Sequence, residues 1–326
     1  MSETRLSPAA DLELPRRRVW GQNNAIAAPS YASFTSRFGY AFPKPYFLES
    51  DLGTTALYEL PPPSGQSKRL VLIIHGVNTP ALGMWPLAKE LQALDKDAHI
   101  ILFDIWGHGL SSTPLVAHTP QIFHFQIFQV LGFMQWTRVH IVGYSFGAST
   151  AITFSVHNPW TALSVAILAP AGLLCKEDFS KQLKELLNNS NGRETEAIDC
   201  VLLYLEGGPL VVPMDWKERV NSGEVIAEAF REWELQEHLG YPHSVLSMFR
   251  DGGAYGCEDY FRKFAQLSLK KIAVVGELDT VCSKSQLVDL GFCDVEMVEK
   301  ADHAIVRSAR GEVAGIVHRF WTQQTQ

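Results

Sequence analysis

Short apolar segments alternate with amphipathic stretches over most of this sequence. Residues 69–74 are apolar on both faces of an extended strand, which is typical of a central parallel strand covered by helices on each side. Further predicted elements follow in turn: helix 81–94, strand 99–104, helix 121–135, strand 139–142, helix 146–157 and strand 163–169. This alternation predicts an α/β fold with a parallel sheet and right-handed crossovers, whose functional groups lie at the carboxyl ends of the strands.

The alternation is absent at the start of the chain and is interrupted in its second half. Residues 1–44 lack a sustained period, so we interpret them as an N-terminal arm. Charged helical segments dominate residues 175–268, which predicts a mainly helical cap inserted into a core built from residues 45–174 and 269–326. The remaining predicted elements are a hairpin of strands 46–49 and 56–60, cap helices 179–187, 196–205 and 224–238, strand 271–276, helix 283–290, strand 295–298 and helix 313–322.

The composition excludes several classes of protein. The chain has 326 residues, 46% hydrophobic, with 28 basic and 35 acidic side chains and a net charge of −7. A negative chain whose basic residues cluster only at 16–18 is not typical of a nucleic-acid-binding protein. Its apolar runs are shorter than the roughly 18 residues of a membrane span, and its first residues carry acids where an export signal would be apolar. We therefore expect a cytoplasmic location without a transmembrane segment.

Cofactor motifs are missing from the sequence. The five cysteines have no Cys-x-x-Cys spacing, so they predict reduced thiols rather than a metal site (Cys175, Cys200, Cys257, Cys282 and Cys293). Neither a dinucleotide fingerprint nor a glycine-rich phosphate loop is present. We expect a protein without a metal or an organic cofactor.

The strongest chemical signal is the pentapeptide Gly143-Tyr144-Ser145-Phe146-Gly147 between a predicted strand and a predicted helix. A serine on such a sharp turn needs glycines beside it because the backbone packs too closely for a Cβ atom. The amino terminus of the following helix supplies N–H donors and positive potential. The pattern predicts that Ser145 is a nucleophile.

A serine nucleophile requires a base and an acid that orients the base. Asp279 follows predicted strand 271–276, and His303 follows predicted strand 295–298, so both lie at the carboxyl edge of the sheet in the order Ser, Asp, His. Asp302 and Glu277 are alternative acids. Asp302 is adjacent to the histidine and is better suited to a local turn, so we favour Asp279.

Acyl transfer also needs N–H donors directed at the negative oxygen of the transition state. One expected donor is the backbone N–H of Phe146, which follows the nucleophile. The other is expected after strand 69–74, where Val77 is the first choice and Asn78 the second. We interpret the side chain of His75, in the same loop, as structural.

These segments together resemble the α/β-hydrolase fold superfamily. The resemblance rests on His75-Gly76, Gly143 to Gly147, Gly276-Glu277-Leu278-Asp279, Asp302-His303 and the stretch 103–111, and it covers about residues 46–320. It implies a mostly parallel eight-stranded sheet, a cap inserted after the sixth strand and a Ser145–Asp279–His303 triad. It also implies structural roles for Asp104 and His108 beside the pocket.

Two positions depart from the pattern of the superfamily. Asp302 stands where relatives often carry glycine before the catalytic histidine, and Cys282 lies in a neighbourhood where many have proline. Neither change removes a predicted catalytic group. Both are expected to alter the shape of the pocket mouth.

The predicted function is a serine hydrolase that cleaves an ester, a lactone or a thioester of a medium-sized hydrophobic small molecule through an acyl-enzyme. A C–C bond hydrolase, an acyltransferase and a non-catalytic ligand receptor of the same fold remain as alternatives, and a homodimer is left open. Asn78, Trp106 and Tyr144 are candidates for the pocket lining, together with Phe146, Trp85 and the cap segments 201–205 and 210–212.

Overall fold

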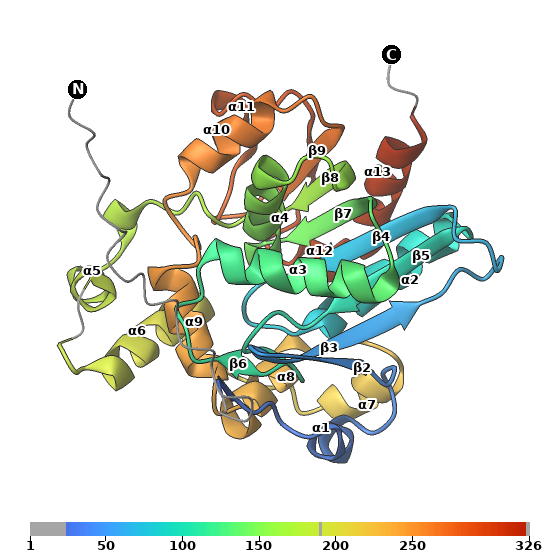
Figure 1. Ribbon diagram of the computed structural model, residues 1–326. Helices are drawn as coiled ribbons and strands as arrows, with labels where there is room; N and C mark the ends of the chain where they lie inside the picture. The colour runs from blue at the N-terminus through green and yellow to red at the C-terminus, as the bar shows by residue number, and fades with distance from the viewer. Residues whose placement is uncertain (1–23, 189–190, 324–326) are drawn as a thin grey trace, which may run out of the picture.

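The structure, a computed structural model, describes residues 24–188 and 191–323, and its centre is an eight-stranded sheet (Figure 1). The strands lie in the order β10-β9-β8-β7-β4-β5-β3-β2. They are β2 (Tyr46–Ser50), β3 (Gly53–Leu60), β4 (Arg69–Ile74), β5 (Ala98–Phe103), β7 (Val139–Tyr144), β8 (Ala162–Leu168), β9 (Lys271–Gly276) and β10 (Val295–Val298). Only the β2–β3 and β3–β5 pairs are antiparallel. The predicted fold class and its mostly parallel eight-stranded sheet are therefore confirmed.

Alternate residues of each central strand belong to different hydrophobic clusters on the two faces of the sheet. In β4, Leu72 and Ile74 belong to one cluster, whereas Val71 and Ile73 belong to the other. All four are buried, which explains why the sequence of this strand shows no polar face. The two faces thus require helices on both sides.

Helices cover both faces of the sheet as this pattern demands. One face is covered by α3 (Pro120–Met134), α4 (Phe146–His157) and α10 (Glu258–Gln266), of which α4 is buried along almost its whole length. The other is covered by α2 (Trp85–Leu94), which follows the 3-10 helix η1 (Ala81–Met84), and by α12 (Ile305–Ser308) and α13 (Arg310–Thr322). The short α11 (Lys284–Asp289) packs against β10. No helix in the described ranges is both long and apolar enough to cross a membrane.

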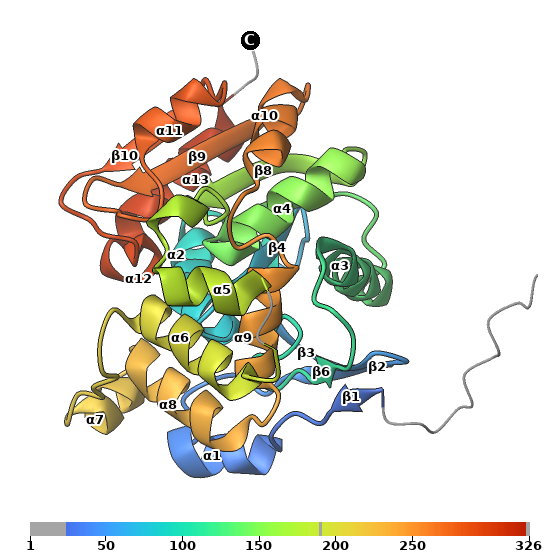
Figure 2. The same cartoon turned by 90° about the vertical axis from the view of Figure 1, so that its left-hand side faces the viewer.

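The chain between β8 and β9, here called the insertion, carries six helices. Besides α10 they are α5 (Lys181–Asn188), α6 (Glu194–Glu206), α7 (Trp216–Asn221), α8 (Ala227–Glu237) and α9 (Tyr241–Arg250), preceded by the short η2 (Lys176–Asp178). Figure 2 shows α5, α6 and α9 stacked in front of one end of the sheet. The predicted helices match α5, α6 and α8, while α7, α9 and α10 were not predicted individually. Of these, α10 packs against α4 on the sheet.

The N-terminal segment contains more secondary structure than expected from a sequence without periodic hydrophobic positions. Residues 1–23 of the predicted arm lie outside the described part, but β1 (Ala25–Ile26) pairs with β6 (Thr113–Pro114), and α1 (Tyr31–Phe38) follows. Phe38 stacks on Phe230 of α8 with ring centroids 4.6 Å apart, and Phe34 contacts Trp233 edge-on. This part of the arm is therefore packed against the insertion.

Candidate active site

Ser145 occupies the sharp turn between β7 and α4. Its backbone has φ 53° and ψ −119°, a conformation that L-residues rarely adopt, and its N–H donates to the Leu168 carbonyl at 3.0 Å. The turn has no room for side chains on either flank: a Cβ on Gly147 would lie 2.2 Å from the Ile74 carbonyl oxygen, and one on Gly143 would lie 2.5 Å from the Gly147 carbonyl oxygen. These contacts explain the two glycines of the pentapeptide.

Strand register brings the predicted site residues to one edge of the sheet. Ile74 of β4 is paired with Gly143 of β7, so the loop after β4 and the Ser145 turn begin at the same level. Gly276 of β9 is paired with Val298 of β10, and the chain continues from these residues to Asp279 and His303. The parallel sheet therefore brings together Ser145 and His303, which are 158 positions apart in the sequence.

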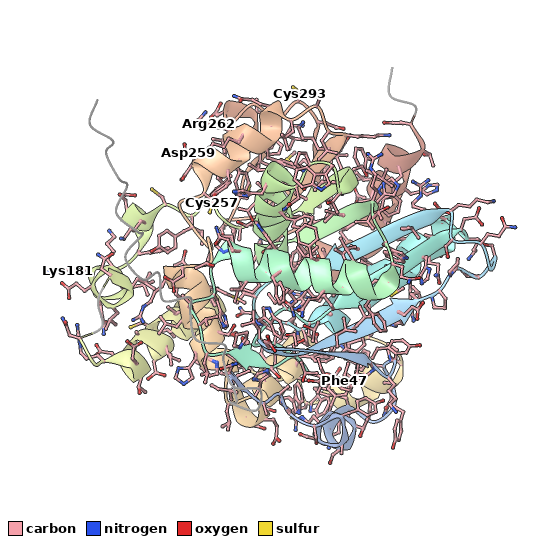
Figure 3. The ribbon with its side chains drawn as sticks, in the orientation of Figure 1. Phe47, Lys181, Cys257, Asp259, Arg262 and Cys293 are labelled. Carbon is pink, nitrogen blue, oxygen red and sulfur yellow. The ribbon has the colours of Figure 1, made fainter. Side chains whose placement is uncertain are left out.

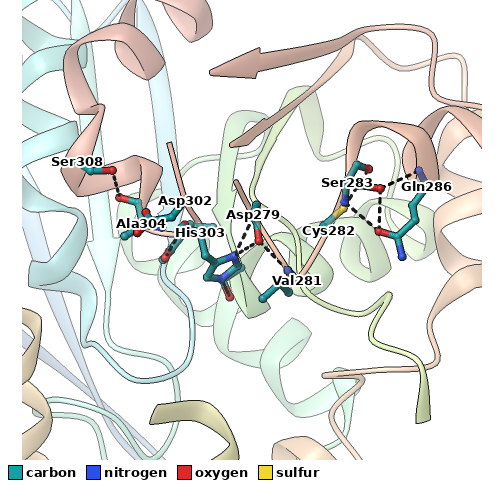
Figure 4. Close-up of polar contacts among 11 residues, drawn as sticks. Asp279, Val281, Cys282, Ser283, Gln286, Asp302, His303, Ala304 and Ser308 are labelled. Atoms are coloured by element: carbon teal, nitrogen blue, oxygen red, sulfur yellow. Dashed lines mark hydrogen bonds and ion pairs between the residues drawn. The ribbon is translucent and has the colours of Figure 1, made fainter. Parts of the chain in front are cut away.

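A chain of hydrogen bonds connects Ser145, His303 and Asp279. His303 Nε2 lies 2.9 Å from Ser145 Oγ. His303 Nδ1 lies 3.0 and 3.1 Å from the two carboxylate oxygens of Asp279 (Figure 4). Because the carboxylate is an acceptor, Nδ1 carries the proton and Nε2 is left to accept from the serine hydroxyl. The side chain of Asp279 is fully buried and also accepts from the Val281 N–H at 2.8 Å.

The two alternative acids have other partners. Asp302 is exposed, and its Oδ1 accepts from the Ala304 N–H at 2.9 Å, which is the local turn contact expected for it (Figure 4). Glu277 accepts from the Lys300 N–H at 2.8 Å. No hydrogen bond joins the side chain of either acid to the His303 ring among the described contacts.

The two expected oxyanion donors lie at the same cavity as Ser145. Phe146 is the first residue of α4, and the first N–H groups of a helix have no acceptor within it. Val77 follows β4 and lines the cavity with Phe146. A Cβ on Gly76 would lie 2.8 Å from the Ser145 Cβ, so the loop that carries Val77 passes close to the serine.

His75 and Asp104 hold the loops beneath this cavity. His75 Nε2 accepts from the Ile105 N–H at 2.9 Å while Nδ1–H donates to the Gly76 carbonyl at 2.6 Å, and burial lowers the pKa of His75 to about 4. Asp104 accepts from two backbone N–H groups, of Ala81 and Leu110, and from the Tyr58 hydroxyl. Burial raises the pKa of Asp104 to about 6. Both side chains face backbone groups rather than the cavity.

His108, the second structural residue implied by the resemblance, is buried in the same region. Its ring packs edge-on against His75 at a centroid distance of 5.4 Å, and its Nδ1 lies 3.3 Å from the Trp106 carbonyl oxygen. Burial lowers the pKa of His108 well below its usual value, so the ring is neutral.

A cavity of about 630 Å³ lies in front of Ser145 and His303. Its apolar lining includes Phe146, Leu174, Tyr204, Leu205, Phe249 and Ala254. Asn78 and Tyr144 also line it, whereas Trp106 is completely buried and its indole N–H points to the Ile122 carbonyl at 3.4 Å. Trp106 is thus a core residue and not part of the pocket lining. The sequence did not reveal which side of its loop faces the cavity. Segment 210–212 does not contribute to this lining.

Charged residues of the cavity were missed from the sequence. Glu206 of α6 and Arg231 of α8 form an ion pair at 3.2 Å, with only 12% and 16% of the two side chains exposed. Burial raises the pKa of Glu206, and Arg231 opposes that change. Arg307 of α12 also lines the cavity, as does Tyr144, whose hydroxyl donates to the His303 carbonyl at 3.1 Å. Their charge was visible in the sequence, but their meeting depends on how the insertion folds.

Metal ligands do not cluster in the part of the chain that the structure describes. Over residues 24–188 and 191–323, no group of three or more His, Cys, Asp or Glu side chains is arranged to hold a metal ion.

Comparisons with known proteins agree with this architecture. The chain is 29% identical over 120 residues to a proline iminopeptidase of Heyndrickxia coagulans and 25% identical over 171 residues to esterase FrsA of Yersinia enterocolitica, covering 36% and 51% of this chain. Each alignment spans 41% of the relative, less than half of its length. The crystal structure of naproxen esterase from Bacillus subtilis superposes with a TM-score of 0.62 at 16% identity, over 90% of this chain and 96% of that one.

The sequence profile of the alpha/beta hydrolase family matches residues 71–316, which is most of the chain. This range includes six strands of the sheet, β4 from its third residue onward and all of β5, β7, β8, β9 and β10, together with Ser145, Asp279 and His303. The chain therefore belongs to the alpha/beta hydrolase family and is an enzyme of the hydrolase type.

Proposed function

We propose that the protein is a serine hydrolase that cleaves an ester, a lactone or a thioester of a medium-sized hydrophobic molecule, with Ser145, His303 and Asp279 as its catalytic residues. The observation that carries this proposal is the continuous hydrogen-bond chain from Ser145 Oγ through the His303 ring to the buried Asp279 carboxylate.

The proposed mechanism has two steps at the same atoms. Ser145 Oγ transfers its proton to His303 Nε2 and attacks the carbonyl carbon, while the carbonyl oxygen becomes negative and accepts from the N–H groups of Phe146 and Val77. His303 then protonates the leaving oxygen or sulfur as the acyl bond breaks. In the second step, water gives a proton to His303 and attacks the acyl-enzyme carbonyl. The bond to Ser145 Oγ then breaks, His303 returns the proton to Ser145, and the acid is released. Asp279 fixes the tautomer of His303 and stabilises its charged form.

The substrate class is inferred from the walls of the cavity. Phe146, Leu174, Phe249 and Ala254 present an apolar surface, and a volume of about 630 Å³ is within the range of small-molecule sites. We propose that the insertion acts as a cap, because its helices α6, α8 and α9 supply one wall of the cavity. The named esterase relatives support cleavage of a carboxylic ester.

The test is hydrolysis of p-nitrophenyl esters and acyl thioesters of two to twelve carbons by wild type and Ser145→Ala. We expect a maximum of kcat/KM at an intermediate chain length. We also expect Ser145→Ala to lose at least about 1000-fold in kcat, since removal of a triad member costs several orders of magnitude. If Ser145→Ala retained more than about 1% of the activity, the assignment of the nucleophile would be wrong.

A further inference from the structure

A second cleft lies beside the active-site cavity. It has a volume of about 700 Å³ and is bordered by α2, α12 and α13 of the core and by the segment between α7 and α8 of the insertion. The two spaces share Ala304 and Arg307 in their linings. These residues come one and four positions after His303, so the second cleft begins immediately next to the proposed base.

The carboxylates of this cleft have arginine partners. Three glutamates line it, and each forms an ion pair with an arginine: Glu90 with Arg310 at 3.5 Å, Glu224 with Arg219 at 2.9 Å and Glu228 with Arg231 at 3.6 Å. Arg231 lies outside the cleft lining and is shared with Glu206, so the charge of Glu228 is offset only in part.

Two further cations line the cleft without such a partner. Among the described residues, no carboxylate lies within 4.0 Å of the Lys89 ammonium group or the Arg307 guanidinium group. Arg307 is half-buried and lines both the cleft and the active-site cavity, so it lies at the boundary of the two spaces. The lining has four cations against three carboxylates, in a chain whose net charge is −7.

The position of the second cleft beside His303 indicates which part of a substrate would enter this cleft. His303 Nε2 must deliver its proton to the leaving atom, so the leaving group departs past His303. The apolar residues Leu174, Phe249 and Ala254 lie in the main cavity and do not line the second cleft. The acyl chain is accordingly assigned to the main cavity and the leaving group to the cleft.

We propose that the cleft between Lys89 and Arg307 binds an oxyanion, a carboxylate or a phosphate, on the leaving group of the substrate. A guanidinium group binds such an anion through two parallel N–H bonds, and a lysine adds a point charge. This inference rests on the proposed function of Ser145. Arg307 is then a residue that determines specificity. The substrate would combine the apolar acyl group already inferred with an alcohol or thiol leaving group that carries an anion.

The experiment compares three butyrate esters with leaving groups of similar shape: 3-hydroxybenzamide, 3-hydroxybenzoate and 3-hydroxyphenyl phosphate. The first is neutral and the others are anionic at pH 7.5. The readout is the ratio of kcat/KM for each anionic ester to that for the neutral ester. We expect wild type to favour an anionic ester by about tenfold, because a hydrogen bond to a charged group contributes about 1.5 kcal/mol or more. The better of the two anionic esters identifies the anion.

Variants assign this preference to the cleft. Arg307→Gln should reduce the ratio about tenfold, and the exposed Lys89→Gln should reduce it about threefold. Raising the salt concentration from 20 to 500 mM, a change that needs no variant, should also reduce it. The matched control is Arg262→Gln on α10, which removes one surface charge far from the cleft and should leave the ratio unchanged (Figure 3).

The outcomes separate this inference from the proposed function. If both types of ester are hydrolysed, but the ratio is the same in wild type, in Lys89→Gln and at high salt, the oxyanion site is wrong and the hydrolase assignment stands. This criterion does not depend on whether Arg307→Gln folds. If wild type hydrolyses none of the esters and Ser145 does not react with a fluorophosphonate, both proposals fail.

Discussion

The two walls of the active-site cavity are built in different ways. The core wall carries Ser145, Asp279 and His303 on loops that leave the carboxyl ends of β7, β9 and β10, and hydrogen bonds join the three side chains. The opposite wall carries Glu206, Arg231 and Phe249 on helices of the insertion. Strand pairing positions the proposed catalytic residues, whereas helix packing positions the insertion residues that line the cavity opposite them.

This difference predicts that substitutions in the two walls affect different quantities. Changes in the core wall should lower kcat or the free energy of unfolding, because close backbone contacts and the hydrogen-bond chain leave little freedom there. Changes in the insertion wall should alter the preference among substrates.

The largest effect is expected from Asp279→Asn. An amide cannot hold His303 in the same tautomer, so kcat should fall by about 10⁴-fold, the loss given for such a replacement in a serine protease. Asp302→Asn is the matched control in the same loop as His303, and kcat should stay within about twofold because this carboxylate bonds only a turn N–H. Steady-state kinetics of the two variants decide between the acids: a severe loss in Asp302→Asn alone would transfer the role to Asp302.

Gly147→Ala tests the close packing of the core wall. The new Cβ would lie 2.2 and 2.4 Å from the carbonyl oxygens of Ile74 and His75, and these backbone atoms cannot turn aside as a side chain would. We expect the free energy of unfolding to fall by about 3 kcal/mol in urea titrations. Gly208→Ala, at a position of the insertion with no atom within 4 Å of the added Cβ, is the control and should change it by less than about 0.5 kcal/mol. Equal stability of the two variants would contradict the account of the Ser145 turn.

Acid should destabilise the core through its buried histidines. Burial lowers the pKa of His75, His118, His124 and His140 to about 4 from 6.5. The unfolded chain therefore binds more protons than the folded one between these values, and stability is lost as the pH falls from 6.5 to 4. The pKa values of Asp104, Glu206, Glu234 and Asp294 are raised, so these carboxyl groups act in the opposite direction. His108 and His238, whose pKa values burial lowers, add to the effect of the four histidines.

The measurement is the free energy of unfolding at pH 6.5 and 4.5 for wild type and His124→Asn. The variant should lose about 2 kcal/mol less than wild type between the two pH values, since a shift of one pKa unit corresponds to 1.36 kcal/mol. The control is His318→Asn on α13, at a half-buried position. An identical loss in all three proteins would show that His124 is not the source.

The smallest expected effect is a change in chain-length preference on Leu174→Ala. Leu174 is half-buried at the start of the insertion and lines the apolar side of the cavity, so its truncation makes room for a longer acyl chain. The ratio of kcat/KM for decanoate to that for butyrate esters should rise by about tenfold, within the range given for small changes in a hydrophobic pocket. An unchanged ratio would show that the acyl chain does not reach this wall.

Much of the core could be predicted from the sequence because its signals are local. The apolar run of β4 has the predicted bounds, residues 69–74, and the predicted strand 295–298 coincides with β10. The turn around Ser145 is encoded by glycines within two positions of it. The positions of Asp279 and His303 follow from a general property of parallel sheets, since successive strand ends meet at one edge.

The insertion was less predictable because its structure depends on contacts between distant segments. The six-residue α7 is too short for a periodic pattern, and α1 became recognisable only through Phe34 and Phe38 against α8. Glu206 and Arg231, which form an ion pair, are 25 positions apart on two different helices, and neither residue belongs to a motif. The direction of Trp106 likewise depended on the packing of its loop against α3.

The measurement that tests the central claim most directly is labelling of the folded protein by a fluorophosphonate probe, which reacts with activated serines without requiring a known substrate. Wild type, Ser145→Ala and heat-denatured protein are compared, and the labelled peptide is identified by mass spectrometry. The account predicts one modification, at Ser145, that is absent from both controls. Absence of labelling in folded wild type, or labelling that persists in Ser145→Ala, would contradict it.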